Sequence, residues 1–367
     1  MNKPIFILGC HKSGTTLVRN LLDGSPGTFA IPIETHFFSH IGLGVAYELA
    51  YTLPKRLKFD EVAHRLCMEI KESNDKPSSQ MKWGDSFIPG SWNIDAFYSY
   101  LYKTGKPFFD AYDLRAFFNC FVQAMYLSLF GEIPSDNIKF VEKSVENAEF
   151  VPVIQNLYPD AKFVHVVRNP YATLVALRRF KYVVGGHYPF IAPLLQSMEN
   201  SYYYLYKNQL HINNYLVVRF EDLLTNPPEV MKKIATFCGI DLNEILLKPT
   251  FLNGKDWLGN SMSGKDFKGI STHPIHSWID EINELEIRMV NLLFPHILRD
   301  YQYDKVGNAK YPLLRFKGES MPNYIANRFY AKSTAYIREV NRDIQQKRYA
   351  KYRADFPKPA VQSPTIQ

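Results

Sequence analysis

The chain opens with a hydrophobic run that changes into a helical repeat. Ile5 to Leu8 are all apolar, which suits a strand buried on both faces of a parallel sheet. Residues 9–14 form a short turn bounded by glycines, and from Thr15 to Leu22 apolar residues recur at the spacing of a helix. The pattern therefore predicts a strand, a tight loop and a helix at the start of the chain.

Apolar runs and helical repeats alternate through much of the remaining chain. The apolar runs predict four further strands, at residues 29–33, 138–141, 161–167 and 215–218. Helical repeats lie near residues 170–180, 192–211 and 228–238. Asn169 and Pro170 supply an N-cap and a first helical residue, and Gly239 ends the last of these helices. This alternation predicts an α/β fold, with a P-loop-like parallel sheet flanked by helices.

Residues 37–135 interrupt the alternation. This block is rich in aromatic residues, and helical patterns lie near residues 60–71, 94–103 and 113–130. The stretch from residue 76 to 90 reads as a loop. Because the sheet pattern resumes only at Ile138, we expect a helical insertion placed over the site, within a domain that spans residues 1–304. Trp83, Trp92 and Tyr112 could stack on a sugar or aryl acceptor, although core packing is the commoner role of such residues.

The C-terminal segment 305–367 carries most of the positive charge. It holds 13 Lys and Arg against 4 Asp and Glu, a net of +9, so the other 304 residues sum to −2 (30 minus 32). A helical pattern runs from about residue 320 to 352, with an apolar stripe formed by Phe329, Tyr336, Ile337, Val340 and Ile344. We therefore expect a basic helical tail whose last residues are disordered.

The charge distribution also bears on partners. A nearly neutral body weakens a nucleic-acid-binding interpretation of the whole protein, and no nucleic-acid partner is expected. For the basic tail two interpretations stay open: contact with an anionic membrane surface or acidic partner, or a solvated helix that packs on its own body.

The remaining composition indicates a soluble globular protein. Hydrophobic residues make up 46% of the 367 residues, the mean hydropathy is −0.23, and no apolar run approaches the length of a membrane span. Cys10, Cys67, Cys120 and Cys238 are scattered without metal-ligand spacing, which fits a reducing compartment. The early first strand leaves no room for a signal peptide. We expect a cytoplasmic, bacterial protein that could be peripheral at the inner membrane.

The first loop has the chemistry of an anion site. The N–H groups of a tight loop and of a first helical turn converge on one point, and the helix dipole favours negative charge there. Gly9 and Gly14 keep the spacing of a Walker A loop, but Thr15 follows Gly14 where that motif has lysine, and the lysine lies at Lys12 instead. The sequence K-S-G-T-T at residues 12–16, directly after an N-terminal strand, resembles the 5′-phosphosulfate loop of sulfotransferases.

The resemblance implies a donor and a product. This family transfers a sulfuryl group from 3′-phosphoadenylyl sulfate (PAPS), releases 3′,5′-ADP and requires no metal. It places Lys12 at the bridging oxygen of the donor, where a cation neutralises developing charge. The donors to the 5′-phosphate would then be Ser13, Gly14, Thr15 and Thr16.

The strand-to-helix corner after residue 161 extends the resemblance. In the family an arginine that ends this strand binds the 3′-phosphate of the donor, and Arg168 matches it. The family has an assisting serine eight residues later, where this chain has Ala176. Thr173, Arg178 or Arg179 could compensate, although the two arginines also fit a solvated helix end.

The catalytic base comes from the segment after the first helix. A-I-P-I-E-T-H-F is similar to a segment of tyrosylprotein sulfotransferases, in which the glutamate is the base, and this implies Glu34. His36 is the alternative, because cytosolic sulfotransferases use a histidine. Lys143 matches a family position at the sheet edge and could be a second catalytic cation, or could form a salt bridge to Glu142 or Glu146.

The nucleotide end rests on two later motifs. R-F-E-D-L at residues 219–223 resembles a family segment whose tyrosine contacts the base, and Phe220 keeps the stacking face without the hydroxyl. W-L-G-N-S at residues 257–261 resembles the element that closes over the nucleotide, which implies Asn260 and Ser261.

Together these motifs imply a PAPS-dependent sulfotransferase. The expected reaction is in-line transfer to a hydroxyl or amine acceptor, with a carbohydrate or glycoconjugate as the expected class. Two alternatives remain: a P-loop kinase, which would bind ATP with Mg²⁺, and a non-catalytic nucleotide-binding module, which would explain Ala176. The lysine position argues against the kinase.

Overall fold

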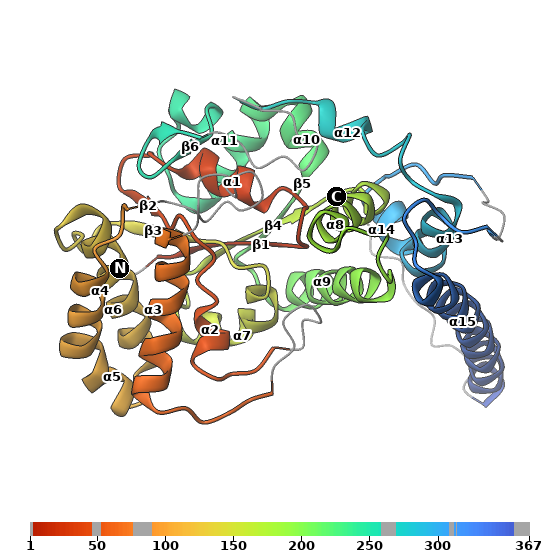
Figure 1. The fold of residues 1–367 in the computed structure, drawn as a ribbon, viewed down its shortest axis with the longest axis horizontal. Coiled ribbons are helices and arrows are strands. Elements are labelled where there is room, and N and C mark those ends of the chain that lie inside the picture. Colours follow the sequence, from red (N-terminus) through yellow and green to blue (C-terminus); the bar gives the residue numbers. More distant parts are fainter. Residues whose placement is uncertain are drawn as a thin grey trace.

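A central parallel sheet organises the molecule. The computed structural model describes residues 3–45, 53–75, 90–257, 269–307, 312 and 314–355. Its main strands are β1 (Ile5–Gly9), β2 (Thr28–Ala30), β3 (Lys139–Glu142), β4 (Lys162–Val167) and β5 (Tyr215–Arg219). They lie in the order β2-β3-β1-β4-β5, and every neighbouring pair is parallel (Figure 1). The predicted α/β fold with a P-loop-like parallel sheet is confirmed.

The two faces of β1 pack against different helices. Ile5 and Ile7 lie in a core with α1 (Thr15–Leu22), α10 (Phe220–Thr225) and α11 (Pro227–Cys238), whereas Phe6 and Leu8 lie in a core with the helices of residues 37–157. Figure 1 shows α1, α10 and α11 on one side of the sheet and α7 and α9 on the other. Because successive strand residues point to opposite faces, the unbroken apolar run is explained by burial on both sides.

The block after β2 is helical, as predicted. It contains α2 (Phe37–His40), α3 (Phe59–Asp75), α4 (Ile94–Tyr100), a π-helical turn (Leu101–Gly105), α5 (Lys106–Asp110) and α6 (Leu114–Phe130). Aromatic rings fill the space beneath α2 and α6: the Phe37 ring centroid is 4.5 Å from that of Phe118 and 5.2 Å from that of Phe121. The predicted loop at residues 76–90 lies outside the described residues, apart from Gly90.

The helices after β3 complete the layers and hold the C-terminal part. They are α7 (Asn147–Leu157), α8 (Pro170–Gly185), α9 (Ala192–His211), α12 (His273–His276), α13 (Glu284–Leu293) and α14 (Pro295–Asp300). A 3-10 turn (Glu244–Leu247) and a small hairpin of β6 (Thr250–Phe251) and β7 (Lys255–Asp256) lie between α11 and α12. Asn169 accepts a hydrogen bond from the N–H of Tyr171 at 3.0 Å, so its predicted capping role at α8 is confirmed.

Two predicted boundaries were wrong. The strand predicted for residues 29–33 ends at Ala30, because Pro32 has no N–H to continue the ladder after Ile31 has donated to Val141 O. The helix predicted to end near residue 180 continues to Gly185 and stops before Gly186, which has φ of 70°.

The tail forms the long helix α15 (Met321–Asp355), whose first part is fastened to the body. The buried Glu319 carboxylate accepts from Arg328 at 2.7 Å and from Asn327 at 2.9 Å. Arg328 also donates to the carbonyl of Leu314, and Asn327 accepts from the N–H of Ile191. Beyond this anchor α15 leaves the body (Figure 1). Residues 356–367, predicted to be disordered, lie outside the described residues.

The structure also bears on the expectations about membrane spans and cysteines. Among the described residues, no helix combines the length and the hydrophobicity that crossing a bilayer requires. All four cysteines are free thiols.

Candidate active site

Each of the five main strands is followed by residues that the sequence predicted for the site, and these residues all lie at the same edge of the sheet. Because parallel strands have their carboxyl ends together, the chain that follows each strand meets the others there. Lys12 follows β1, Glu34 and His36 follow β2, Lys143 follows β3, and Arg168 follows β4. Phe220 follows β5. The fold thus brings together motif residues that are spread over more than 200 positions of the sequence.

The loop after β1 has a backbone that only particular residues tolerate. Gly14 has φ of 100°, and a Cβ atom there would lie 2.2 Å from the ring of Phe220. A Cβ at Gly9, with φ of 149°, would lie 2.6 Å from the carbonyl oxygen of Val166. Lys12 itself is in the left-handed region, with φ of 64°. The two glycines are therefore required by close packing, and the lysine is held in an uncommon conformation.

Arg168 holds the loop in this shape. Its Nη1 donates to the carbonyl oxygen of Lys12 at 2.7 Å, and its Nη2 donates to that of Pro274 at 3.1 Å. The guanidinium lies 5.0 Å from the centre of the Phe220 ring, and burial lowers the pKa of Arg168 to about 10. The Lys12 ammonium lies 4.6 Å from the centre of the Phe180 ring. Arg168 therefore braces the loop.

Two buried donors at this loop are not satisfied. Within the described part of the chain, Ser13 Oγ and Arg168 Nε have no hydrogen-bond partner, and the two residues are 1% and 9% exposed. An unsatisfied buried donor costs roughly 1–3 kcal/mol, so such groups in a native fold usually await a partner. The positions of a hydroxyl and a guanidinium N–H beside Lys12 fit an anionic group such as a phosphate.

Glu34 lies in an ion-pair cluster beside the loop. Its carboxylate forms an ion pair with Lys143, whose side chain is 2% exposed, and its other oxygen lies 3.8 Å from His36 Nε2. The sequence alternatives paired Lys143 with Glu142 or Glu146, and the structure shows an ion pair with Glu34, which neither alternative contained. Glu34 is 17% exposed, so its carboxylate is the member of the pair that reaches solvent.

His36 is a cation in this cluster. Its Nδ1 lies 2.5 Å from Glu146 Oε1, and its backbone is left-handed with φ of 47°. Burial alone would lower the pKa of His36, but the charge and hydrogen bond of Glu146, with the charges of Glu34 and Glu69, outweigh burial and raise the pKa to about 10. A protonated imidazole has no lone pair to accept a proton, so His36 is poorly suited to act as the base at neutral pH.

A fully buried glutamate supports both loops. Glu142 accepts from Thr35 Oγ1 at 2.8 Å, from Ser144 Oγ at 2.6 Å and from Asn147. Burial raises the pKa of Glu142 to about 7, while the hydrogen bonds from Ser144 and Thr35 oppose that rise. Ser144 Oγ also accepts from the N–H groups of Thr35 and His36. This network, which sequence reasoning missed, fixes the chain directly after Glu34 to the loop that follows β3.

His11 is a second residue that sequence reasoning missed. Burial lowers the pKa of its imidazole to about 4, so the ring is neutral at physiological pH, and the charges of Glu34, Glu146, Lys143 and Lys12 all act on it. The loop lysine and the Glu34 cluster are therefore both close enough to this neutral ring to act on it electrostatically. A histidine next to the loop lysine was the available signal, because imidazoles often occur where protons move.

The remaining predicted residues divide into two groups. Thr15 and Thr16 are buried in the first turn of α1, as expected for a phosphate loop, and Phe220 is 6% exposed against Gly14. Asn260 and Ser261 lie outside the described residues, so their predicted role stays a prediction.

The two arginines that follow Ala176 on α8 form ion pairs within the protein. Ala176 is 8% exposed on α8. Arg178 lies 2.5 Å from buried Glu286, and Arg179 forms an ion pair with Glu281, so neither is a solvated helix end. Thr173 Oγ1 donates to Asn169 O at 3.0 Å.

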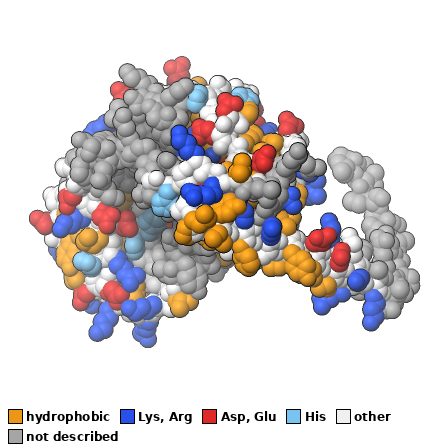
Figure 2. Space-filling view, turned by 45° about the vertical axis from the view of Figure 1, so that its right-hand side comes forward, with side chains coloured by type: hydrophobic (Ala, Val, Ile, Leu, Met, Phe, Trp, Pro, Cys, Tyr) orange, Lys and Arg blue, Asp and Glu red, His pale blue; other side chains and the backbone are white. Residues whose placement is uncertain are grey.

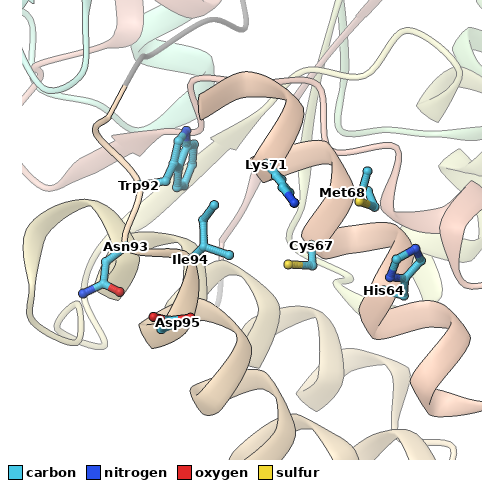
Figure 3. Close-up of a pocket in the computed structure, with 8 residues that line it drawn as sticks. All are labelled: His64, Cys67, Met68, Lys71, Trp92, Asn93, Ile94 and Asp95. Atoms are coloured by element: carbon cyan, nitrogen blue, oxygen red, sulfur yellow. The ribbon is translucent and has the colours of Figure 1, made fainter. Parts of the chain in front are cut away.

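A hollow among the helices of residues 37–135 lies away from the Glu34 ion-pair cluster. It has a volume of about 580 Å³ between α3 and the start of α4, and Trp92 and Lys71 are among the residues that line it (Figure 3). Trp92 is 5% exposed, and its Nε1 donates to Ser73 Oγ at 3.3 Å, which is a core role. His40 of α2 contacts α3 through Glu69, roughly 100° or more around the helix from the lining residues. The hollow is thus on the other side of α3 from this contact.

The cluster also has the elements of a cation site. Ligand-type atoms of Glu34, His36 and Glu146 lie within 4.8 Å of one another. A metal needs a deprotonated imidazole, and the raised pKa of His36 opposes that. Lys143 already neutralises Glu34. An ion-pair cluster describes this arrangement better than a metal centre.

Comparison with known proteins agrees with the loop and fold. A sequence model of the sulfotransferase family matches residues 4–244. Similar solved structures include the sulfotransferase domain of the Synechococcus PCC 7002 olefin synthase (21% identity, 83% of this chain and 97% of that chain, TM-score 0.45). Another is the sulfotransferase domain from the curacin biosynthetic pathway (18% identity, 83% of this chain and 99% of that chain, TM-score 0.47).

A mouse sulfotransferase solved with PAP is also similar (15% identity, 81% of this chain and 85% of that chain, TM-score 0.37). None of the curated proteins matches this chain. The family match spans more than half of the sequence and includes the loop, the Glu34 cluster and Arg168. The protein belongs to the sulfotransferase family.

Proposed function

We propose that this sulfotransferase uses PAPS as its donor and transfers the sulfuryl group directly to a hydroxyl or amine acceptor. The observation that carries the proposal is the gathering of Lys12, after β1, and of the Glu34–Lys143 ion pair, after β2 and β3, at one edge of the sheet. A cation for the leaving group and a carboxylate for the acceptor are the two groups that such a transfer needs.

The unsatisfied donors support the choice of donor substrate. Ser13 Oγ and the N–H groups of the first turn of α1 would hold a 5′-phosphate, with Lys12 beside them. Arg168 Nε is a further donor, and Phe220 lies between Arg168 and Gly14. The solved mouse relative holds PAP, the 3′,5′-ADP product of such a donor. When bound, PAPS supplies the sulfuryl group and leaves as 3′,5′-ADP.

Glu34 is the proposed base. Its carboxylate is the partly exposed member of the cluster, and its negative charge is balanced by Lys143 and by the His36 imidazolium. Glu34 accepts the proton of the acceptor hydroxyl as the oxygen forms its new bond to sulfur. The bond between sulfur and the bridging phosphate oxygen breaks, and Lys12 neutralises the charge that remains on that oxygen. His36, held by Glu146, positions Glu34 and is not itself the base.

The acceptor is proposed to be a carbohydrate or glycoconjugate. Support comes from the likeness of the Glu34 segment to carbohydrate and tyrosylprotein sulfotransferases, and from the helical block α2–α6 that starts directly after this segment. We propose that this block, residues 37–135, forms the acceptor side of the domain.

Two ligands separate this proposal from its alternatives. Calorimetry would be run with 3′,5′-ADP in the presence of EDTA and with Mg·ATP. We expect tight, metal-independent binding of 3′,5′-ADP, and a preference for Mg·ATP would instead indicate a kinase. Turnover with ³⁵S-labelled PAPS and a panel of saccharides then tests for catalysis: binding of 3′,5′-ADP without hydrolysis or transfer would indicate a non-catalytic module.

A further inference from the structure

The projecting part of α15 exposes a row of large apolar side chains. Its members are Ile325 (59% exposed), Phe329 (73%), Tyr336 (68%), Ile337 (55%), Val340 (36%) and Ile344 (43%). At 100° per residue these side chains fall within roughly 120° of arc, so they share one face of the helix. We call these six residues the α15 stripe. Figure 2 shows a band of hydrophobic side chains that runs from the body toward the projecting arm, with Lys and Arg beside it.

The part of α15 beyond the anchor has little packing of its own. From residue 336 to 348 every described residue is exposed, and the ion pair of Arg338 with Glu199 at 2.6 Å is a rim contact with the body. A helix gains most of its stability from packing an apolar face, and single helices of this length are marginal in water. The α15 stripe is therefore a surface that requires a partner.

The charges around the stripe indicate what that partner is. From Lys332 to Lys351 the chain has six Lys and Arg and two Asp and Glu, a net of +4 (6 minus 2). On the helix Lys332 and Arg348 lie within roughly 20° of the two edges of the stripe. Lys347 and Lys351 continue the stripe toward the C-terminus, and lysine stems can lie on apolar surface while the ammonium reaches an anion. Asp343 also lies at the Ile325 edge of the stripe and Glu339 roughly 40° outside it, so the charged residues at the stripe carry a net of +2 (4 minus 2), and this excess complements an anionic surface.

The width of the stripe disfavours a second copy of this helix. A two-stranded coiled coil needs a narrow seam that repeats at alternating steps of three and four residues. The most apolar seam of this kind contains Tyr330, Ser333, Ile337, Val340, Ile344 and Lys347. Ser333 and Lys347 are polar, and the exposed Phe329 and Tyr336 fall outside the seam, so a coiled coil would leave both aromatic side chains uncovered. A broad apolar arc bordered by lysine and arginine is instead typical of helices that lie in the headgroup region of a bilayer.

We propose that α15 docks this protein on an anionic lipid bilayer, with the α15 stripe in the interface and its basic residues on the headgroups. The helix lies on the surface and does not span it. The catalytic domain is then held at the membrane through the Glu319–Arg328 anchor of α15. The inference is independent of the donor and acceptor proposed above.

Vesicle cosedimentation of the full-length protein tests the proposal. The probes are vesicles of pure phosphatidylcholine and vesicles of an equal mixture of phosphatidylcholine and phosphatidylglycerol. We expect binding to the mixed vesicles that exceeds binding to phosphatidylcholine at least tenfold and weakens with added salt, since each basic residue near the surface contributes about a fivefold factor. Val340→Glu and Ile344→Glu should each reduce partition by at least about tenfold, because a buried aliphatic side chain is lost.

Gln345→Glu is the matched control, because it introduces the same charge on the opposite face of the helix. It should lower partition by about fivefold at most, and all three variants should keep the circular dichroism and melting temperature of the parent. Absence of vesicle binding, or equal binding by Val340→Glu, would overturn the proposal. If light scattering instead finds a dimer that Val340→Glu dissociates, or polyglutamate binds while vesicles do not, the surface belongs to a second copy or to an acidic polypeptide.

Discussion

Two clusters of buried charge in this protein have opposite designs. The cluster that fastens α15 sets one carboxylate, Glu319, against one guanidinium, Arg328, and the remaining bonds go to the Asn327 amide and to backbone groups. The cluster at the sheet edge sets three carboxylates, Glu34, Glu142 and Glu146, against the cations Lys143 and His36. The first is balanced, and the second has an excess of negative charge.

The difference separates a structural role from a chemical one. In the balanced cluster every charge has a fixed partner, and nothing is available to a ligand. In the sheet-edge cluster burial raises the pKa of Glu142 to about 7, and Glu146 helps to raise the pKa of His36 to about 10. Perturbed groups of this kind are characteristic of functional sites. Substitutions in the two clusters should therefore affect different measurements.

Glu34→Gln should have the largest effect on turnover. Removal of a general base typically lowers kcat by roughly 10²–10⁴-fold. The variant should fold, because the amide oxygen of glutamine can still accept a hydrogen bond from buried Lys143. Steady-state assays with labelled PAPS would measure this, with Glu229→Gln on the exposed face of α11 as a control that keeps full activity. Near-parental turnover in Glu34→Gln would remove the base assignment and direct attention to His36.

Arg328→Met should affect stability and spare turnover. Loss of one partner of a buried ion pair leaves Glu319 uncompensated, so the free energy of unfolding should fall by about 3–5 kcal/mol. Urea unfolding measures the loss, and kcat per folded molecule should stay at the parental value. The double variant Glu319→Gln with Arg328→Met should recover part of the stability. A double variant no more stable than Arg328→Met would contradict the ion-pair explanation.

Lys12→Ala should lower kcat by about 10²–10³-fold, the usual effect of removing one group that stabilises developing charge. Stability should change little, because the backbone shape of the loop depends on Arg168 and on Gly14 rather than on the ammonium. In the reverse reaction with nitrophenyl sulfates the phenol leaves on the Glu34 side, so the defect of Lys12→Ala should be the same for phenols of different pKa. A defect that shrinks as the pKa of the phenol falls would place Lys12 on the acceptor side instead.

Gly14→Ala should destabilise the fold by roughly 1–3 kcal/mol, since a left-handed position is strained for alanine and the Cβ would overlap Phe220. Thermal unfolding would measure the effect. In the double variant Gly14→Ala with Phe220→Ala, the overlap is gone and only the backbone strain remains. The two losses should therefore be less than additive, and simple additivity would show that the ring does not clash.

Stability should also depend on pH. His36 has a pKa of about 10 in the folded protein against an ordinary value of 6.5, so the folded state binds the proton more tightly. The stability that protonated His36 contributes is fully present below about pH 6.5 and is lost as pH rises through about 10. The difference in unfolding free energy between parent and His36→Gln should shrink over this window. A constant difference from pH 6 to about 10.5 would contradict the raised pKa.

The parts of the site that sequence reasoning found are those encoded locally. The strand, loop and helix from Ile5 to Leu22 follow from neighbouring residues, and the structure confirms their bounds within one residue. The partner of Lys143 could not be found in this way, because Glu34 is 109 positions away and meets it only when β2 pairs with β3. Pairing of strands that are distant in sequence is a tertiary property, so sequence reasoning offered only nearby glutamates.

Buried polar residues were the second part of the site that sequence reasoning did not predict. Glu142 ends a strand and reads as an ordinary boundary, yet it is fully buried and accepts hydrogen bonds from three side chains. His11 reads as a loop residue, and its environment depends on which loops follow β2 and β3. In both cases the chemistry comes from what surrounds the residue, which the local pattern does not contain.

The grip of Arg168 on the Lys12 carbonyl has a thermodynamic consequence for ligand binding. The loop already holds its left-handed residue in place, so the conformational entropy of that segment is lost when the domain folds and not when a ligand arrives. The contacts of a bound phosphate would then be offset by a smaller ordering entropy, although the entropy of association and the desolvation of the phosphate still oppose binding. A protein without this guanidinium would bind the same ligand with a larger opposing entropy, even where every phosphate contact was kept.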